Sequence, residues 1–346
     1  MTILRERADV LVVGGGPGGL ACATVLAQGG ARVIVAERKL LIGPKVCAGG
    51  ITWHGLIRHV PASLIERAFP AQHIVTPRQR VVVTESDPIV ATISRERLGQ
   101  WMAGQAEAAG VRLLTGTQAL GLEAGRAVLE GADTGRITVE FGHLVGADGS
   151  NSLVRRWLGL PSAMGLGLHC MLAGDHPRME WHLNGGLFGS GYAWIFPHAG
   201  QSSIGAYGDA ANLPARTLKE RLLTWAAAQG FSLSPVTIQA GLVNYDFRGV
   251  RFGATWLVGD AAGLASALTG EGIYPALVSG QVVARRILDA HASAGELQGM
   301  IKKHRLHRRV LRLAGTNPLL RNLLMEVLVI FLRLKILDFH TLEMAD

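Results

Sequence analysis

The stretch Val10-Leu-Val-Val-Gly-Gly-Gly-Pro-Gly-Gly19 decides the fold of this chain. A short apolar run leads into a glycine cluster, and the helix-forming segment 20–28 follows. Gly14, Gly16 and Gly19 match the pattern G-x-G-x-x-G. In that pattern the first glycine permits a tight turn, the second admits a pyrophosphate against the backbone, and the third lets the helix pack closely on the strand. The stretch therefore predicts a strand, a phosphate-binding loop and a helix.

An acidic residue at the right distance strengthens this prediction. Glu37 closes a second predicted strand at 32–36. A carboxylate there accepts hydrogen bonds from ribose hydroxyls, while the helix N-terminus faces the phosphates. The segment predicts a bound dinucleotide, held by Gly14, Gly16, Pro17, Gly18, Gly19, Glu37 and Arg38.

Composition limits the class of protein and the partners it can have. Of 346 residues, 49% are hydrophobic and 17% are charged, with a net charge of +8. This is enough for two domains or one large composite domain with a sizeable core. The positive charge could serve nucleic acid, anionic lipid or a phosphate-bearing substrate. Because the sequence has no aromatic-interleaved basic patch, we expect no nucleic acid and favour the other two.

The positions of the cysteines and the hydropathy pattern indicate the cellular compartment. Cys22, Cys47 and Cys170 are scattered, without a CxxC pair or a metal-ligand spacing. We therefore expect a reduced cytoplasmic compartment and no metal. The charged segment 1–9 does not resemble a signal peptide, and no stretch of about 20 uncharged apolar residues predicts a spanning helix.

The loop Ile42-Gly-Pro-Lys-Val-Cys-Ala-Gly-Gly-Ile51 follows the first half-unit. A loop in this place falls near the carboxyl ends of the strands, where ligands bind. Cys47 could be a redox or proton-donating thiol, with Lys45 favouring its thiolate. From spacing alone, the simpler alternative of a small residue in a tight loop is favoured.

The next region, 80–141, predicts strands at 80–84, 89–93, 111–115, 119–122, 127–129 and 137–141, with a helix at 94–109. The later strands are separated by glycines and predict a hairpin sheet inserted in the nucleotide-binding part. Arg95 begins the helix. It could reach a phosphate, or it could be an ordinary exposed arginine.

Two further strands end in acidic turns. Asp148-Gly149 closes the strand that begins at Leu144, and Gly259-Asp260 closes the strand that begins at Trp256. The loop 269–274, Thr-Gly-Glu-Gly-Ile-Tyr, and a helix at 275–290 follow the second turn. Asp260 can accept a polyol hydroxyl, and a loop with glycines at 270 and 272 can approach a ring system closely.

An aromatic strand lies at 191–197, Gly-Tyr-Ala-Trp-Ile-Phe-Pro. Its alternation places Tyr192, Trp194 and Phe196 on one face. Composition favours an aromatic core face, and the alternative is a wall over a planar or apolar ligand. A helix predicted at 217–229 would cover a sheet.

The C-terminal part combines a basic stretch, 302–312, with an apolar helical stripe along 319–337. Charged residues such as Arg321 and Glu326 interrupt the stripe and argue against a membrane span. Two interpretations are open: an amphipathic helix at a membrane surface, and a helix packed over the substrate cavity.

The three nucleotide motifs occur in an order that resembles FAD enzymes of the aromatic-hydroxylase class, over about residues 8–290. This resemblance implies an α/β fold: a glutathione-reductase-like Rossmann FAD-binding domain of the hydroxylase subclass, with an inserted mixed β-sheet substrate domain and C-terminal helices. The expected FAD-binding domain comprises 1–75, 92–160 and 250–300. The expected substrate domain comprises 76–91 and 161–249, and a C-terminal amphipathic helical segment comprises 301–346.

Within that class, the loop 45–50, the strand 192–197 and the loop 269–274 resemble the geranylgeranyl reductase family, which saturates isoprenoid double bonds in chlorophyll side chains, archaeal lipids or quinones. The resemblance implies that the cysteine loop lies near the flavin and the aromatic strand along the prenyl cavity. The implied cofactor residues are Lys45, Cys47, Ala48, Gly49, Arg95, Asp148, Gly149, Gly259, Asp260, Gly270, Gly272 and Ile273. The implied substrate residues are Tyr192, Trp194, Phe196 and Pro197.

The leading hypothesis is an FAD-dependent reductase of a prenyl or similarly apolar alkene. NAD(P)H or ferredoxin would reduce the flavin, whose hydride would pass to the alkene, with Cys47 first and Tyr192 second as candidates for proton handling. Peripheral contact of 302–337 with the inner face of a membrane remains open, as does an electron-donor protein. Two alternatives are an FAD monooxygenase or halogenase, and a membrane-associated electron-transfer flavoprotein.

Overall fold

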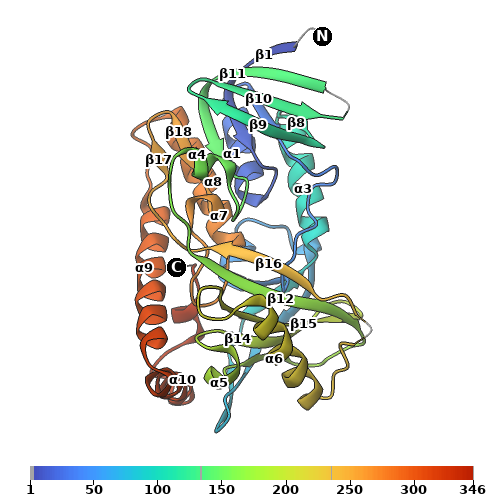
Figure 1. Ribbon diagram of the computed structural model, residues 1–346, viewed down its shortest axis with the longest axis vertical. Coiled ribbons are helices and arrows are strands. Elements are labelled where there is room, and N and C mark those ends of the chain that lie inside the picture. The colour runs from blue at the N-terminus through green and yellow to red at the C-terminus, as the bar shows by residue number, and fades with distance from the viewer. Residues whose placement is uncertain (1–3, 133–134, 235, 346) are drawn as a thin grey trace.

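The glycine-rich stretch lies in the middle of an eight-stranded sheet in the computed structural model, which describes residues 4–132, 135–234 and 236–345 (Figure 1). The path of this sheet runs β17-β18-β11-β1-β2-β8, and β9 and β10 extend it from β11. Its strands are β1 (Leu4–Val13), β2 (Val33–Ala36), β8 (Arg112–Leu114), β9 (Thr117–Glu123), β10 (Arg126–Gly131), β11 (Gly135–Gly146), β17 (Arg251–Phe252) and β18 (Thr255–Leu257). β1 runs parallel to β2 and β11 on either side, so the predicted α/β core is confirmed.

β1 is apolar without interruption because both faces of the sheet are covered. Val10 and Val12 pack in one core with α1 (Pro17–Gln28), α3 (Arg95–Ala108) and α8 (Ile273–Leu288). Leu11 and Val13 pack in a second core with residues of β9, β10 and β11. Continuous burial on both sides is what turns the short run before the glycines into the central strand.

The sequence prediction divides β11 into two strands, and this is wrong. β11 is continuous: its first part pairs with β10, and its last part lies between β1 and β18. Gly142 interrupts the apolar pattern, yet Phe141 and His143 keep their register with Ala8 and Val10 of β1. The pairing partners therefore hold the strand together where composition alone predicts a break.

A seven-stranded sheet forms the other end of the molecule, in the order β16-β12-β15-β14-β13-β5-β6 (Figure 1). Its strands are β5 (Ala71–Val75), β6 (Arg80–Thr84), β12 (Met164–Ala173), β13 (Met179–His182), β14 (Tyr192–Pro197), β15 (Gln201–Asp209) and β16 (Gln239–Asn244). Because β5 belongs to this sheet, the sheet begins before the domain boundary predicted at residue 76. α6 (Ala215–Ala228) covers it with Leu218, Leu222 and Trp225.

Short elements connect the two sheets. β3 (Gly50–Thr52), β4 (Ile65–Phe69) and β7 (Val90–Ile93) form a small antiparallel sheet. The remaining short helices are α2 (Trp53–Ile57), α4 (Leu153–Trp157), α5 (Gly185–Phe188) and α7 (Gly259–Ala262), with 3-10 turns at Ala62–Leu64 and Phe339–Leu342. The Ser152 side chain caps α4 by accepting a hydrogen bond from the Arg155 N–H.

The C-terminal helices run along one side of the molecule and join its two ends (Figure 1). α9 (Gly295–Thr316) ends at Asn317, whose side chain caps α10 (Pro318–Arg333). Glu326 of α10 accepts hydrogen bonds from Thr76 (3.0 Å) and Gln79 (2.6 Å), which fastens the helix to the β5–β6 hairpin. Among the helices of the described residues, none is long and apolar enough to span a membrane.

Candidate active site

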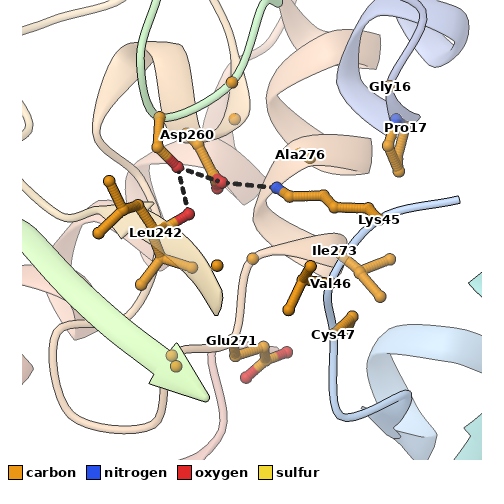
Figure 2. A pocket seen from close by; sticks show the side chains of 18 of the residues that line it. Gly16, Pro17, Lys45, Val46, Cys47, Leu242, Asp260, Glu271, Ile273 and Ala276 are labelled. Atoms are coloured by element: carbon orange, nitrogen blue, oxygen red, sulfur yellow. Dashed lines mark hydrogen bonds and ion pairs between the residues drawn. The ribbon is translucent and has the colours of Figure 1, made fainter. Parts of the chain in front are cut away.

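One cavity of about 800 Å³ is lined both by the glycine loop and by the aromatic strand β14. Figure 2 shows part of its wall, where Lys45, Val46 and Cys47 of the cysteine loop lie opposite Asp260 and Leu242. The predicted cofactor residues and the predicted substrate residues thus border a single space. Its two ends differ in chemistry.

The glycine loop is as tight as its sequence predicts. Gly14 has a φ of +109°, and a methyl group on it would lie 2.4 Å from the Ala147 carbonyl oxygen. A methyl group on Gly19 would lie 2.0 Å from the Gly14 carbonyl oxygen. The Glu37 carboxylate accepts hydrogen bonds from the backbone N–H groups of Gly15 (2.7 Å) and Lys39 (2.9 Å). This acid therefore fixes the loop as well as bordering the cavity.

Two polar side chains at this end have buried atoms without partners. Arg95 lines the cavity, and its Nε and Nη1 are buried with no hydrogen-bond partner among the described residues. Asp148 Oδ2 accepts a hydrogen bond from the Leu153 N–H (2.6 Å), while Oδ1 is buried without one. Burial raises the pKa of Asp148 above its usual range. A cationic group and a polar acceptor left open in this way fit the pyrophosphate and hydroxyl groups of a dinucleotide.

The Lys45 side chain pairs with Asp260, whereas the sequence hypothesis placed its charge beside Cys47. Its Nζ binds Asp260 Oδ2 at 2.9 Å, and Ser150 donates a hydrogen bond to the same oxygen at 3.1 Å (Figure 2). The hypothesis that Lys45 favours a Cys47 thiolate is therefore not supported, because the ammonium group pairs with the buried carboxylate. This pair joins the cysteine loop to the Gly259-Asp260 turn.

Cys47 lines the cavity in a loop that His198 holds in place. Its Sγ accepts a hydrogen bond from the Gly49 N–H at 3.4 Å. His198 Nε2 lies 2.9 Å from the Ala48 carbonyl oxygen, and its Nδ1 lies 2.5 Å from Glu66 Oε2. A methyl group on Gly49 would lie 2.3 Å from the His198 ring, so the loop can take this path only with glycine there.

The other end of the cavity has an aromatic wall. Tyr192, Trp194 and Phe196 share one face of β14, with 5.9 Å between successive ring centroids. Trp181 of the neighbouring strand packs on Phe196 with the ring centroids 4.6 Å apart. These rings line the cavity and also pack in a buried hydrophobic cluster.

The polar atoms of this wall are already bound to protein. The Tyr192 hydroxyl donates to the Thr269 carbonyl oxygen (2.6 Å), and Trp194 Nε1 donates to Ser203 (3.0 Å). Burial also raises the pKa of Tyr192 above its usual range. With its proton committed to a carbonyl, Tyr192 is a poor acid, and the wall as a whole presents carbon to a ligand.

α10 and the C-terminal turn complete the apolar end, which the sequence did not predict residue by residue. The cavity-lining residues from this part of the chain are Met325, Leu328, Leu332, Phe339, Leu342 and Glu343. Other side chains of the predicted stripe, including Leu320, Leu323 and Phe331, face outward. α10 therefore covers the cavity and also exposes an apolar face.

Glu271 is a cavity-lining residue that the sequence prediction missed, although it lies in the predicted ring-binding loop 269–274. Thr52 donates to its Oε1 (3.2 Å), and the Met344 N–H donates to its Oε2 (3.1 Å). Burial raises its pKa to about 7, and the nearby Glu343 acts in the same direction. The signal that could have found it is a carboxylate between two loop glycines beside the ring-binding site.

Three predicted residues do not reach the cavity wall. Gly19 packs inside α1 against Gly14, Gly49 packs against His198, and the Pro197 carbonyl oxygen accepts a hydrogen bond from Thr92 (2.9 Å). These three residues pack behind the residues that line the cavity and support them. The other predicted cofactor and substrate residues line the cavity.

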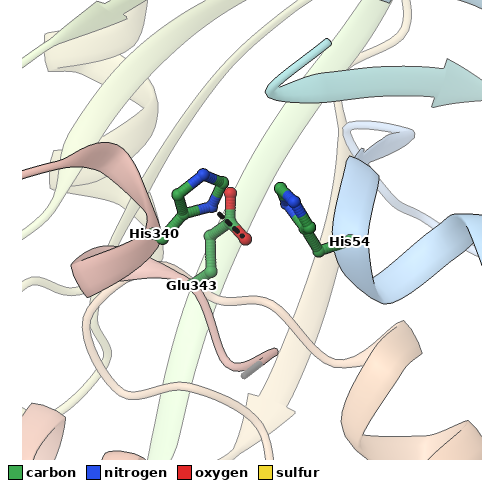
Figure 3. Close-up of side chains that lie close together, drawn as sticks. All are labelled: His54, His340 and Glu343. Atoms are coloured by element: carbon green, nitrogen blue, oxygen red, sulfur yellow. Dashed lines mark ion pairs between the residues drawn. The ribbon is translucent and has the colours of Figure 1, made fainter. Parts of the chain in front are cut away.

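Beside the cavity, His54, His340 and Glu343 gather from two distant segments (Figure 3). The centroids of the two imidazole rings lie 4.3 Å apart. His340 Nδ1 lies 3.3 Å from Glu343 Oε2, and its Nε2 lies 2.9 Å from Glu85 Oε2. Both ring nitrogens of His340 thus have carboxylate partners, so the group is an ion-pair network.

Comparison with known proteins identifies the family of this chain. The FAD binding domain family matches residues 7–171. A digeranylgeranylglycerophospholipid reductase of Methanosphaera stadtmanae is 32% identical, over 84% of this chain and 81% of the relative. The chain belongs to the geranylgeranyl reductase family. A geranylgeranyl diphosphate reductase of Rhodobacter capsulatus is 28% identical to this family member, over 89% of this chain and 83% of the relative.

The fold of this geranylgeranyl reductase family member is also that of a solved structure. A geranylgeranyl bacteriochlorophyll reductase-like protein from Thermoplasma acidophilum superposes with a TM-score of 0.82 at 23% identity, over 95% of this chain and 92% of that one. The family member is an FAD-dependent oxidoreductase. The open Arg95 guanidinium and the Gly14–Gly18 loop fit the pyrophosphate of FAD, and Asp260 fits its polyol chain.

Proposed function

We propose that this oxidoreductase saturates C=C bonds of a prenyl chain. The observation that carries the proposal is the continuity of the cavity, from the glycine loop to a wall of Tyr192, Trp194 and Phe196. A wall of aromatic rings whose Tyr192 hydroxyl and Trp194 Nε1 already bind protein groups suits a hydrocarbon chain. The names of the relatives, which are reductases of geranylgeranyl compounds, support the same substrate class.

FAD, when bound at the glycine-loop end, supplies hydride chemistry. The residues of the chain bind the cofactor, position the substrate and exclude water. The rings of β14 and the α10 side chains Met325 and Leu328 exclude water and hold the prenyl chain against the cofactor end. Arg95 and the glycine loop fix the cofactor, and Cys47 lies in the loop between cofactor and substrate. NAD(P)H or ferredoxin is proposed as the external donor.

The proposed activity is tested with purified holoenzyme under anaerobic conditions. Reduced protein is mixed with geranylgeranyl diphosphate or a digeranylgeranyl glycerophospholipid, and the lipids are analysed by mass spectrometry. We expect products that have gained two hydrogen atoms for each saturated bond. A modified aromatic product formed only with oxygen would instead indicate a monooxygenase or halogenase. Quinone reduction with unchanged prenyl lipid would indicate an electron carrier.

The role of Cys47 is tested in the same assay with Cys47→Ser. If the thiol handles protons or gates the flavin, product formation falls while FAD content stays the same. Unchanged product formation and unchanged flavin reduction would leave Cys47 as a small residue in a tight loop.

We also propose that α9 and α10 contact an anionic membrane surface. Apolar side chains on α10 and just after it are exposed, with Leu319 79%, Leu323 59% and Leu334 62% exposed. Exposed cations such as Arg305 and Arg309 of α9 lie on the same helical pair. An apolar face with basic neighbours binds acidic lipid headgroups better than neutral ones.

Membrane contact is tested by co-sedimentation with vesicles of phosphatidylglycerol or phosphatidylcholine. We expect binding to the anionic vesicles that decreases with salt and is lost in the double variant Leu319→Glu, Leu323→Glu. Leu120→Glu is the matched control, because Leu120 is 42% exposed on β9, away from these helices. Equal binding by both variants would contradict the proposal.

A further inference from the structure

We propose that Glu271 is the proton donor for alkene saturation and that Glu343, His340 and Glu85 return the proton to it from solvent. This inference deepens the proposed function and rests on it. It assigns the proton step to a residue other than Cys47 or Tyr192.

Glu271 lies where the two ends of the cavity meet. It belongs to the loop 269–272, whose Thr269 carbonyl oxygen accepts the Tyr192 hydroxyl at 2.6 Å. Its two carboxyl oxygens are held separately, one by Thr52 and the other by the Met344 N–H. Figure 2 shows the carboxyl group in the pocket wall. A fixed carboxyl between the cofactor end and the aromatic wall is placed to reach an alkene carbon.

The surroundings of Glu271 favour the protonated acid near neutral pH. Burial raises its pKa to about 7, the Glu343 charge also raises it, and the Met344 and Thr52 hydrogen bonds and Lys303 lower it. The phenol of Tyr192, the other titratable group that interacts with Glu271, has a pKa raised by burial and stays neutral. Efficient general acids have a pKa close to the working pH, and a carboxyl in an apolar pocket is a known way to reach it.

Titratable groups lie between Glu271 and the surface, and the Glu343 charge acts on Glu271 directly. The Met344 N–H that binds Glu271 follows directly after Glu343, whose side chain is 1% exposed and whose Oε1 has no partner among the described residues. Glu343 Oε2 lies 3.3 Å from His340 Nδ1 (Figure 3). His340 Nε2 lies 2.9 Å from Glu85, and these two side chains are 33% and 26% exposed.

His340 is suited to carry protons between these groups. Burial acts to lower its pKa, but Glu343 and Glu85 outweigh burial, so the pKa is raised. Burial likewise raises the pKa of Glu343. An imidazole with a carboxylate on each ring nitrogen can accept a proton on the outer side and release one on the inner side.

Saturation breaks the π bond and forms one C–H bond on each carbon. FAD bound at the glycine-loop end would supply the hydride for one carbon, and the external donor would return two electrons to it. The Glu271 O–H bond breaks and its proton forms the second C–H bond, which leaves a carboxylate. A proton then passes from His340 through Glu343 to Glu271, and solvent restores His340 beside Glu85.

The test compares Glu271→Gln, Glu271→Asp and the control Glu130→Gln, a surface residue paired with Arg136. The assay uses anaerobic reduced holoenzyme and geranylgeranyl diphosphate. We expect Glu271→Gln to keep its FAD content and flavin reduction rate but to lose product formation by about a hundredfold or more, with partial recovery in Glu271→Asp. The wild-type rate should fall as pH rises through about 7, because the protonated form disappears.

A Glu271→Gln variant that forms product at the wild-type rate would overturn the assignment while leaving the proposed function intact. A wild-type enzyme that leaves prenyl substrates unchanged would overturn both.

The relay is tested independently with His340→Ala, which does not alter Glu271. The first turnover should proceed at the wild-type rate, since Glu271 is already protonated, and later turnovers should slow and recover on addition of imidazole. Slowing of the first turnover to the same extent as later ones, or no recovery with imidazole, would overturn the relay.

Discussion

The two ends of the cavity are built in different ways. The cofactor end is built around the backbone of a contiguous glycine loop, in which a methyl group on Gly14 or Gly19 would overlap a carbonyl oxygen. The substrate end is made of side chains that come from β14, α10 and the C-terminal turn, which are far apart in sequence. Backbone requirements leave a local signature in the sequence, and gathered side chains do not.

The ends also differ in what they leave unsatisfied. Within the described part of the chain, Arg95 and Asp148 have buried polar atoms without partners, whereas Tyr192 and Trp194 of the aromatic wall donate to protein groups. The open groups of Arg95 and Asp148 suit a charged ligand beside the glycine loop, and the satisfied hydroxyl and indole of the aromatic wall suit an apolar one. If this contrast is correct, variants at the two ends should affect cofactor and substrate separately.

The largest effect is expected for Gly19→Ala. The new methyl group would lie 2.0 Å from the Gly14 carbonyl oxygen, so helix and loop must separate. We expect destabilisation by about 3 kcal/mol, at the upper end for overpacking, and loss of bound FAD, measured by thermal unfolding and flavin absorbance. Gly104→Ala is the control, because its methyl group would meet nothing within 4 Å. A Gly19→Ala protein with full FAD content would contradict the tight-loop account.

The next largest effect is expected for Arg95→Met. Removal of a buried guanidinium with open N–H groups should weaken FAD binding by about tenfold to a hundredfold, since a hydrogen bond to a charged group contributes about 1.5–3 kcal/mol. The apoprotein should be equally or more stable, because an unpaired charge is lost. Flavin fluorescence titration measures the FAD affinity, and thermal unfolding of the apoprotein measures its stability. Arg97→Met, which removes a hydrogen bond to the Ser63 carbonyl oxygen, should leave FAD affinity unchanged.

A smaller effect, on the prenyl substrate and not on FAD, is expected for Phe196→Leu in the aromatic wall. FAD affinity should be unchanged, stability should fall by about 1 kcal/mol, and the KM for the prenyl substrate should rise several-fold through lost ring contact. Phe231→Leu is the control, since Phe231 packs with the core beneath α6 and does not line the cavity. A change in FAD affinity without a change in KM would reverse the assignment of the two ends.

The smallest effect at neutral pH concerns α9, the helix that joins the ends. Burial lowers the pKa of His304 and of His307 to about 4. Both are therefore neutral in the fold, while in the unfolded chain they bind protons below about pH 6.5. Stability should fall as pH decreases from about 6.5 towards 4. His304→Phe should flatten this dependence in thermal unfolding, and the exposed His291→Phe should not.

Much of the cofactor end was predictable from sequence. The strand, glycine loop, helix and Glu37 follow one another in the chain, and Arg95 begins a helix whose cap, Ser94, is visible in the sequence. The continuity of β11 was not predictable, because Gly142 breaks its pattern and only pairing with β1 reveals it. The direction of Lys45 was not predictable either, since its partner Asp260 lies 215 residues away.

Less of the substrate end was predictable. The alternation of β14 placed three rings on one face, but alternation does not distinguish a core face from a cavity wall. The raised pKa of Glu271 depends in part on the nearby Glu343 charge. Its position depends on a hydrogen bond from Met344, a tertiary contact that the sequence does not reveal. The stripe on α10 could not be divided into cavity-facing and outward-facing parts before its packing on the β5–β6 hairpin was known.

The central claim is that reducing equivalents stored at the cofactor end pass directly to an alkene held at the aromatic end. The most direct measurement is stopped-flow flavin absorbance of the reduced holoenzyme mixed with geranylgeranyl diphosphate in the absence of oxygen. We predict that the flavin is reoxidised by the prenyl substrate, with one saturated bond formed for each flavin. Flavin that stays reduced until oxygen is admitted, with the prenyl chain unchanged, would contradict the account.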